Sequence, residues 1–284
     1  MKRYILPSVI LFAVVIFLPS MGLAINSGAH IYVTEQVFGS DDVDLLYGSI
    51  APDLSLYVPD VGSWTTGFMD THYNYIILWP QGWTEPWKRF TMGWMVHNEA
   101  WGADFYSHIE YEYPDGTTVP GYVVHKAAIL APNIPIPNPV LQMLIAHNAI
   151  EFAIDLLVQE YLDPDLGMDL YQSAVGRSDE DVRRLFNILV AKGKVTDRET
   201  LFQSETTFRE LILLYSPVLA ASDLGNMWPL AQLGAALAYE LYGAQIPVDQ
   251  VHALLQASVA LCIGDYEQFI SDTIEGIKNE LDQD

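Results

Sequence analysis

Apolar residues recur at helical spacing along most of the chain, and clusters of turn residues separate these runs. Residues 58–90 differ, because they are rich in Gly, Pro and aromatic residues and show no sustained period. We expect a long structured loop there, with at most one short helix. Before and after this region, the pattern predicts helices over 27–39, 91–111 and 122–130, and a further helix that starts at Pro139. The segment 41–54 is also helical, and its helix is expected to end at Pro52.

The second half of the chain has a helical pattern almost throughout. Ser178 with Asp181 and Thr196 with Glu199 have the spacing of N-terminal caps, and Gly193 stands where a helix would stop. Strand signals are scarce, so we predict an all-α fold, a multi-helix bundle with additional C-terminal helices. Amphipathic runs are expected over 198–215, 223–242, 248–262 and 265–281.

The first 24 residues have the organisation of a secretory signal peptide. Lys2 and Arg3 precede an apolar run of roughly fifteen residues, and Gly22 and Ala24 supply the small residues that a signal peptidase inspects. We expect export with cleavage after Ala24; the alternative is an uncleaved membrane anchor, because the run is only slightly short of a spanning helix. The remainder would form a helical region over 25–164 and a C-terminal helical region over 165–284, which either stands apart or belongs to the same domain.

Charge and cysteine content narrow the classes of function. The formal net charge of −23 repels phosphate backbones and anionic lipid headgroups at long range, so we expect no stable nucleic-acid binding. Bound divalent cations would reverse this sign locally. The single cysteine, Cys262, excludes an internal disulfide, so an exported chain must be stabilised by its core or by another group such as bound metal.

Histidines gather with nearby carboxylates between residues 30 and 151. Only His252 lies beyond residue 147, and the other histidines are His30, His72, His97, His108, His125 and His147. Carboxylates lie near them in sequence, namely Asp53, Asp70, Asp104 and Glu151. A lone histidine in such a chain is more often a satisfied core residue or part of a solvated face. The clustering instead predicts a shared site.

Spacing supports that prediction. On a continuous helix through MVHNEAWGADFYSH, the side chains of His97, Asp104 and His108 project within about 20° of one stripe. Glu151 follows His147 by four residues, so both lie on adjacent turns of one face. Two such helices can face each other across a bundle interior, and buried imidazoles and carboxylates are costly there unless they are paired or coordinated. We therefore predict a metal cluster.

The available ligands indicate the metal and the reaction. Imidazole and carboxylate groups without a useful thiolate favour zinc first, then manganese or iron. At about four ligands per ion, the candidates suffice for two zinc ions and a third. Closely spaced zinc ions are suited to hydrolysis of a phosphate ester. A zinc peptidase is disfavoured because the chain has no HExxH motif.

Five segments in order, AHIYVTE, GSIAPDL, THYNYI, GWMVHNEAWGADFYSH and HNAIEFAIDLL, resemble the zinc-dependent phospholipase C family. The resemblance covers roughly residues 25–160 and implies the all-helical fold that this family shares with the fungal single-strand-specific nucleases. It implies a first zinc held by Asp53, His72, His97 and Asp104, a second by His108, His147 and Glu151, and a third served by His30 with Asp104.

The chain departs from the family pattern at two points. The family's helix aspartate follows its histidine by four residues, where this chain has Trp101, so Asp104 is interpreted as the replacement. The family also uses an N-terminal tryptophan at the third metal, and none lies near Ala24. His125 is an extra candidate that could replace or supplement His108, although a surface histidine beside Lys126 is the simpler interpretation.

Further roles are expected for individual residues. Asp53 is a candidate general base as well as a ligand, with an ordinary turn residue as the alternative. Asp70 is expected to orient His72. The aromatic residues between 64 and 94 could contact lipid or stack on substrate, but packing around the metal-bearing helices is the simpler interpretation.

The resemblance implies an exported zinc phosphodiesterase that hydrolyses phospholipids, with transient membrane contact. A nuclease of the same fold is the nearest alternative. A non-catalytic helical interaction protein, stabilised by metal, is the second class of function. Release of phosphocholine or of nucleotides by the zinc-loaded protein would separate these classes.

Overall fold

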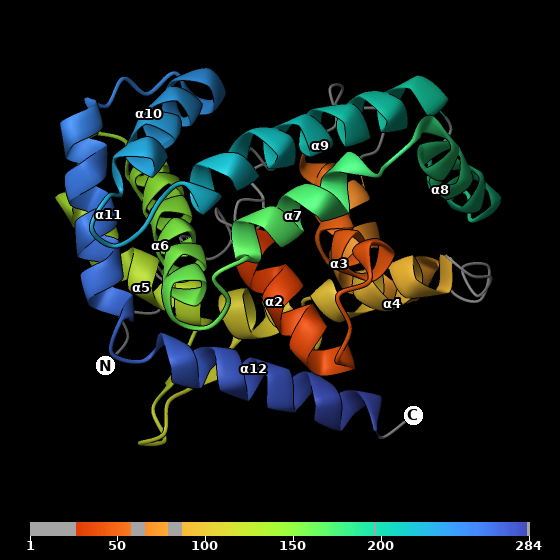
Figure 1. The fold of residues 1–284 in the computed structure, drawn as a ribbon, viewed down its shortest axis with the longest axis horizontal. Helices are drawn as coiled ribbons and strands as arrows, with labels where there is room; N and C mark the ends of the chain where they lie inside the picture. Colours follow the sequence, from red (N-terminus) through yellow and green to blue (C-terminus); the bar gives the residue numbers. More distant parts are fainter. Residues whose placement is uncertain (1–26, 58–65, 79–86, 196, 283–284) are drawn as a thin grey trace, which may run out of the picture.

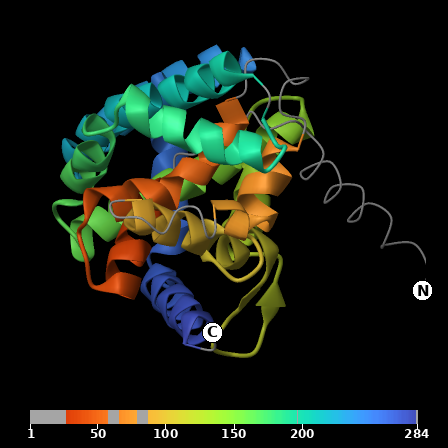
Figure 2. The same ribbon diagram turned by 90° about the vertical axis from the view of Figure 1, so that its right-hand side faces the viewer.

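The computed structural model describes residues 27–57, 66–78, 87–195 and 197–282, and these fold into helices almost throughout (Figures 1 and 2). The predicted all-α class is confirmed. The strands in the described residues form one small antiparallel hairpin of β1 (Tyr111–Glu112) and β2 (Thr118–Val119), in which Tyr111 pairs with Val119. The predicted signal peptide lies outside the described residues.

Helix α6 (Pro139–Tyr161) is mostly buried inside the fold and begins at Pro139, as predicted. The Asn138 side chain caps it by accepting hydrogen bonds from the first backbone N–H groups. Helices α2 (Ser27–Phe38), α5 (Tyr122–Leu130) and α11 (Val248–Cys262) pack against it. Among the described helices, α6 alone is long and apolar enough to cross a membrane, yet most of it is buried inside the fold, as in the core helix of a globular domain.

Helices α3 (Val43–Ile50) and α4 (Trp87–His97) cross in close backbone contact. A Cβ atom on Gly48 would lie 2.2 Å from the Phe90 carbonyl oxygen, and one on Gly93 would lie 2.0 Å from the Leu45 carbonyl oxygen. Only glycine permits such an approach. The crossing places the last residue of α4, His97, beside the end of α3.

The predicted continuous helix over 91–111 is wrong. Helix α4 ends at His97, and the Asn98 side-chain oxygen then accepts hydrogen bonds from the backbone N–H groups of Ala100, Trp101 and Gly102 at 2.7, 2.9 and 3.3 Å. An asparagine that satisfies three N–H groups in this way competes with the helical hydrogen bonds. The chain turns and resumes helical structure as the π-helical segment η4 (Phe105–Ile109).

The region 58–90 is described only in part. Where it is described it holds the π-helical segment η2 (Met69–Tyr73), the 3₁₀ segment η3 (Tyr75–Leu78) and the start of α4, so it contains more helical structure than expected. Two further 3₁₀ segments continue preceding helices: η1 (Ala51–Tyr57) after α3, and η5 (Ala131–Asn133) after α5.

The second half is helical, as predicted. Ser178 and Asp181 form a capping box, and the backbone of Gly193 has a positive φ just after a helix ends. Asp197, rather than the expected Thr196, caps the next helix, while residue 196 itself lies outside the described residues. The remaining helices are α7 (Leu166–Val175), α8 (Asp179–Ala191), α9 (Arg198–Ala220), α10 (Trp228–Tyr242) and α12 (Tyr266–Leu281).

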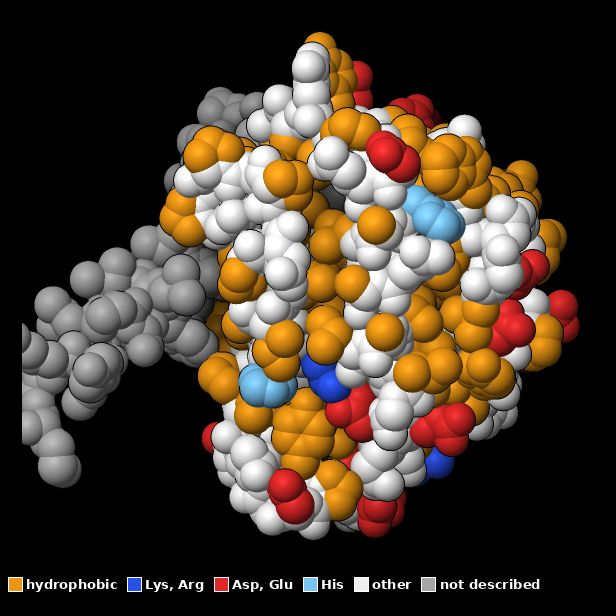
Figure 3. All heavy atoms as spheres, turned by 90° about the vertical axis from the view of Figure 1, so that its left-hand side faces the viewer, with side chains coloured by type: hydrophobic (Ala, Val, Ile, Leu, Met, Phe, Trp, Pro, Cys, Tyr) orange, Lys and Arg blue, Asp and Glu red, His pale blue; other side chains and the backbone are white. Residues whose placement is uncertain are grey.

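Helix α12 lies along the outside of α2 (Figure 1). Polar contacts join this end of the chain to the first half: Tyr111 donates to Asp272 at 3.0 Å, and Lys126 pairs with Asp265 at 2.6 Å. The face that includes α11 is mainly apolar or neutral, with acidic side chains mostly toward its margin (Figure 3).

We predict that Gly93→Ala destabilises the protein, because the new Cβ atom would meet backbone rather than a flexible side chain. The cost expected for such overpacking is about 1–3 kcal/mol or more in the free energy of unfolding, measured by urea denaturation. Gly264→Ala is the control, since a Cβ atom there meets nothing within 4 Å. Equal effects of the two substitutions would contradict the proposed role of the close crossing.

Candidate metal centre

The structure brings the eight side chains predicted as ligands to one place, from seven segments of the chain. We call this set, together with Glu99, the histidine–carboxylate centre. Several triads within it have ligand atoms within 4.8 Å of one another and could hold a metal ion. Its members are His30 on α2, Asp53 in η1, His72 in η2, His97 at the end of α4, Glu99 and Asp104 between α4 and η4, His108 in η4, and His147 and Glu151 on α6.

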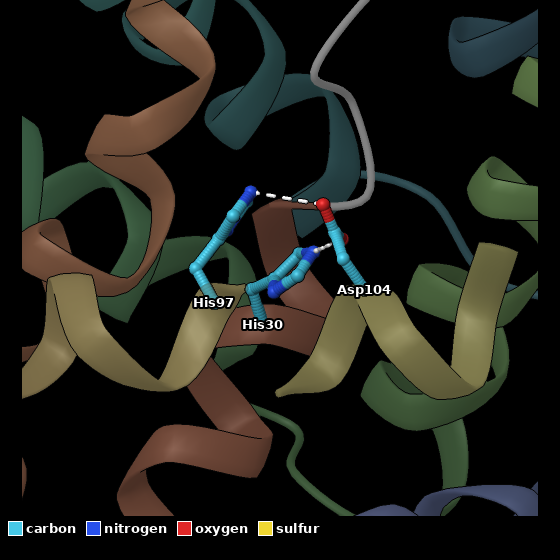
Figure 4. Close-up of side chains that lie close together, drawn as sticks. All are labelled: His30, His97 and Asp104. Atoms are coloured by element: carbon cyan, nitrogen blue, oxygen red, sulfur yellow. Dashed lines mark ion pairs between the residues drawn. The ribbon is translucent and has the colours of Figure 1, made fainter. Parts of the chain in front are cut away.

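Asp104 lies at the middle of this centre, and its two carboxylate oxygens face different histidines. Oδ1 is 3.1 Å from Nε2 of His30, and Oδ2 is 3.1 Å from Nε2 of His97 (Figure 4). Nε2 of His72 is 3.6 Å from Oδ2. Asp53 closes this side of the centre, with Oδ1 at 3.2 Å from Nε2 of His72 and 3.5 Å from Nε2 of His97.

A second group adjoins the first on the α6 side. Nε2 of His147 is 2.9 Å from Oε1 of Glu151, as expected for residues four apart on a helix. His108 presents Nε2 to the same oxygen at 3.6 Å and Nδ1 to Oδ1 of Asp104 at 3.7 Å. The His108 ring therefore links the two groups.

The turn after α4 explains why Asp104 and His108 still reach the centre without a continuous helix. It also brings in Glu99, which sequence analysis missed. On a continuous helix Glu99 would point about 200° away from His97. In the turn, its backbone N–H donates to the His72 carbonyl at 3.0 Å, and its buried carboxylate lies 3.9 Å from Nδ1 of His108. Asn98, a residue type that often ends helices, was the available signal.

Hydrogen bonds outside the centre fix the orientation of two imidazoles. His97 donates its Nδ1–H to the Ser49 carbonyl at 2.7 Å, which leaves the lone pair of the neutral ring on Nε2. Nδ1 of His72 is 2.7 Å from the Thr71 hydroxyl, which itself donates to the Phe68 carbonyl. His72 therefore donates to Thr71, and its Nε2 lone pair also faces the carboxylates.

The expectation that Asp70 orients His72 is wrong. Asp70 is buried, but it accepts hydrogen bonds from Thr66 at 2.6 Å and Asn74 at 3.3 Å, and it pairs with Lys194 at 2.6 Å. Thr71, adjacent to His72 in sequence, holds the ring instead. His125 also lies apart from the centre, with its ring against Tyr113.

Lone pairs that face carboxylates in a buried site require positive charge between them. Without metal, protons supply it: burial alone would lower the pKa of His97, but Asp104 and Asp53 outweigh it and hold this pKa well above its ordinary value. Conversely, burial would raise the pKa of Asp104, yet His97 and His108 hold it well below its ordinary value. Burial would lower the pKa of His108, but Asp104 and Glu151 raise it to about 9.

The unsatisfied atoms of the centre fit metal ions. Two ligands of a tetrahedral zinc ion lie about 3.3 Å apart. The nitrogen–oxygen pairs around Asp104 and Asp53 lie at 3.1–3.6 Å. The ion pairs formed by the described residues bring no lysine or arginine into the centre. Within the centre, the buried atoms left without a hydrogen-bond partner are Nδ1 of His30, Nε2 of His97, Oδ1 of Asp104, Nε2 of His108 and Oε2 of Glu151.

No protein-family model, curated protein or solved structure matches the chain. The family resemblance therefore stays a prediction. The structure itself shows an all-helical protein with buried histidine–carboxylate groups that could hold metal ions, and it does not identify the ions or their number.

We predict that the metal-free protein loses stability as the pH rises from about 6.5 to about 9. The carboxylates raise the pKa of His108 from 6.5 to about 9, so the stabilisation by its protonated form is complete below the lower value and is lost through the upper one. Urea unfolding in the presence of a chelator across this range would measure the loss.

The matched control is His108→Gln, which removes this titration and should make the metal-free pH dependence shallower. Saturation with zinc should have a similar effect, because bound cations take the place of the protons. A metal-free stability that stays constant or rises across the range in the unmodified protein would contradict the assignment.

Proposed function

We propose that the chain is an exported zinc-dependent phosphodiesterase that hydrolyses phospholipids in the manner of a phospholipase C. One observation carries the proposal: imidazole nitrogens and carboxylate oxygens from seven segments face one another in a buried site without a full set of hydrogen bonds. A fold that only needed stability could fill this space with apolar side chains at lower cost. Adjacent ion positions favour phosphate-ester hydrolysis.

Two ions account for most of the ligands. Asp53, His72, His97 and Oδ2 of Asp104 would hold the first, whereas Nε2 of His108, His147 and Glu151 would hold the second. His30, which faces Oδ1 of Asp104, is available to a third. Bound zinc lowers the pKa of water and stabilises negative charge on phosphoryl oxygens.

Exposure indicates the side from which a substrate reaches the centre. The side chain of His97 is fully buried, whereas those of His108 and His147 are 21% and 24% exposed. A phosphoryl group would therefore enter beside His108 and His147. The chain is strongly acidic overall, so an anionic substrate would be attracted only when cations are bound there.

Asp53 is the residue that we assign to proton transfer. At 11% exposure its side chain is more accessible than those of Asp104 and Glu151, at 3% and 5%. Burial alone would raise its pKa, but His97 and His72 lower it, so the carboxylate is ionised and can accept a proton from an attacking water. Its Oδ1 contacts both imidazoles.

The choice of a lipid over a nucleic-acid substrate rests on charge. The net charge of −23 and the lack of clustered basic residues oppose binding of a long polyanion, although a single strand could still stack on aromatic side chains. Transient contact with a lipid surface and export from the cell belong to this proposal. A non-catalytic protein stabilised by metal is the alternative from another class.

We predict that purified protein binds at least two zinc ions and releases phosphocholine from phosphatidylcholine micelles. His97→Ala should remove the ion of the first position and Glu151→Ala that of the second, because each removes a buried ligand. Metal analysis after dialysis and product assays on phosphatidylcholine and on single-stranded DNA would test this. Nucleotide release alone would favour the nuclease, and zinc binding without turnover of either substrate would favour the structural role.

We further predict that Asp53→Asn lowers kcat on the order of 10²- to 10⁴-fold at saturating zinc, because an amide cannot accept the proton. His72, His97 and Asp104 remain to hold the first ion. The exposed Asp115, changed to Asn, is the control and should leave kcat unchanged. A fully active Asp53→Asn enzyme that retains its zinc would exclude the proposed base.

A further inference from the structure

We propose that Glu99, Oδ1 of Asp104 and Nδ1 of His108 form an additional cation position, which adjoins the second ion position and shares the His108 ring with it. This inference rests on the metal centre of the proposed function but assigns a ligand that neither the spacing pattern nor the family resemblance supplies. We call it the Glu99 position.

The three ligand atoms of the Glu99 position lie within 4.8 Å of one another. Nδ1 of His108 is 3.7 Å from Oδ1 of Asp104 and 3.9 Å from Oε1 of Glu99. Both separations are too long for hydrogen bonds, whose nitrogen–oxygen distances are about 2.7–3.2 Å. They approach the separation of atoms that share a cation, about 3.3 Å for a tetrahedral zinc ion.

An unsatisfied buried atom points into this position. Asp104 is 2% exposed, and its Oδ1 receives no hydrogen bond of acceptable geometry, although Nε2 of His30 lies 3.1 Å away and Nδ1 of His108 lies 3.7 Å away. Oδ2 of the same carboxylate is directed to His97 and the first ion position. Asp104 can therefore serve the first ion position with Oδ2 and the Glu99 position with Oδ1, the oxygen that also faces His30.

Glu99 is itself held in place for this role. It is 8% exposed, and its backbone N–H donates to the His72 carbonyl at 3.0 Å, which ties it to the segment that carries a ligand of the first ion. Burial and then the Glu99 carboxylate raise the pKa of the Tyr73 hydroxyl, so this hydroxyl is a neighbour of the carboxylate. The ion pairs of the described residues bring no lysine or arginine to Glu99, and a buried carboxylate without such a partner favours a cation.

His108 would use both ring nitrogens. Nε2 faces Glu151 and the second position, while Nδ1 faces Glu99 and Asp104. Coordination through both nitrogens requires the ring to lose its N–H proton, which is released to solvent as the cation binds. Two carboxylates and one imidazole suit zinc or manganese, and the 21% exposure of the His108 side chain leaves this side open to exchange.

Zinc stoichiometry tests the Glu99 position directly. Full-length protein and its Glu99→Gln variant are loaded with zinc, dialysed and measured for bound metal, alongside the exposed Glu110→Gln as the matched control. We expect Glu99→Gln to bind one ion fewer per chain than wild type and Glu110→Gln to bind the wild-type number. Circular dichroism and the ions that remain bound show whether the variant is folded.

Two further variants assign the lost ion. His147→Ala should lose the second ion but keep the Glu99 position, whereas His108→Ala should lose both, because its ring is shared. The inference is overturned if Glu99→Gln binds the wild-type number of ions with unchanged affinity. It is also overturned if the number is unchanged but affinity at the second position falls, because Glu99 would then only orient His108. Neither result depends on hydrolysis, so failure of the proposed activity remains distinguishable.

Discussion

The stability of the fold depends on positive charge, from protons or metal ions, that balances a group of buried carboxylates. Asp53 and Asp104 are buried, and His72 and His97 beside them present lone pairs because their other ring nitrogens are hydrogen-bonded outside the centre. Such an arrangement is stable only with protons or cations between the ligands. Bound metal would therefore serve as a structural crosslink between helices in a chain that has no disulfide, whatever its chemistry.

Two local features of the backbone make this centre possible. The glycine contact between α3 and α4 brings His97 close enough to donate to the Ser49 carbonyl, which directs its Nε2 inward. The Asn98 turn then interrupts the helix, so that Glu99 and Asp104 enter the same space. Neither feature supplies a ligand atom, yet each determines where ligand atoms lie. Substitutions at such positions can change metal binding without touching a ligand.

The centre also shows how one polar group can serve several positions. Asp104 directs one oxygen to His97 and the other to His30 and His108, and His108 in turn faces carboxylates from both ring nitrogens. Shared ligands couple neighbouring ions, because loss of one ion leaves a bridging group with unbalanced charge. Shared ligands also reduce the number of polar residues that must be buried, and burying each one costs free energy of desolvation. The gradient of exposure toward His147 then leaves one side accessible to a substrate.

The sequence by itself determined the helical class, most helix boundaries in the second half, and the set of histidines and carboxylates that gather, because periodicity and residue type are local properties. It did not determine the end of α4, since apolar spacing continues past His97 while a single asparagine side chain stops the helix. Only the tertiary structure placed Glu99 in the centre and showed that Thr71, rather than Asp70, contacts the His72 ring. Those choices depend on distances between segments far apart in the chain, which no local pattern encodes.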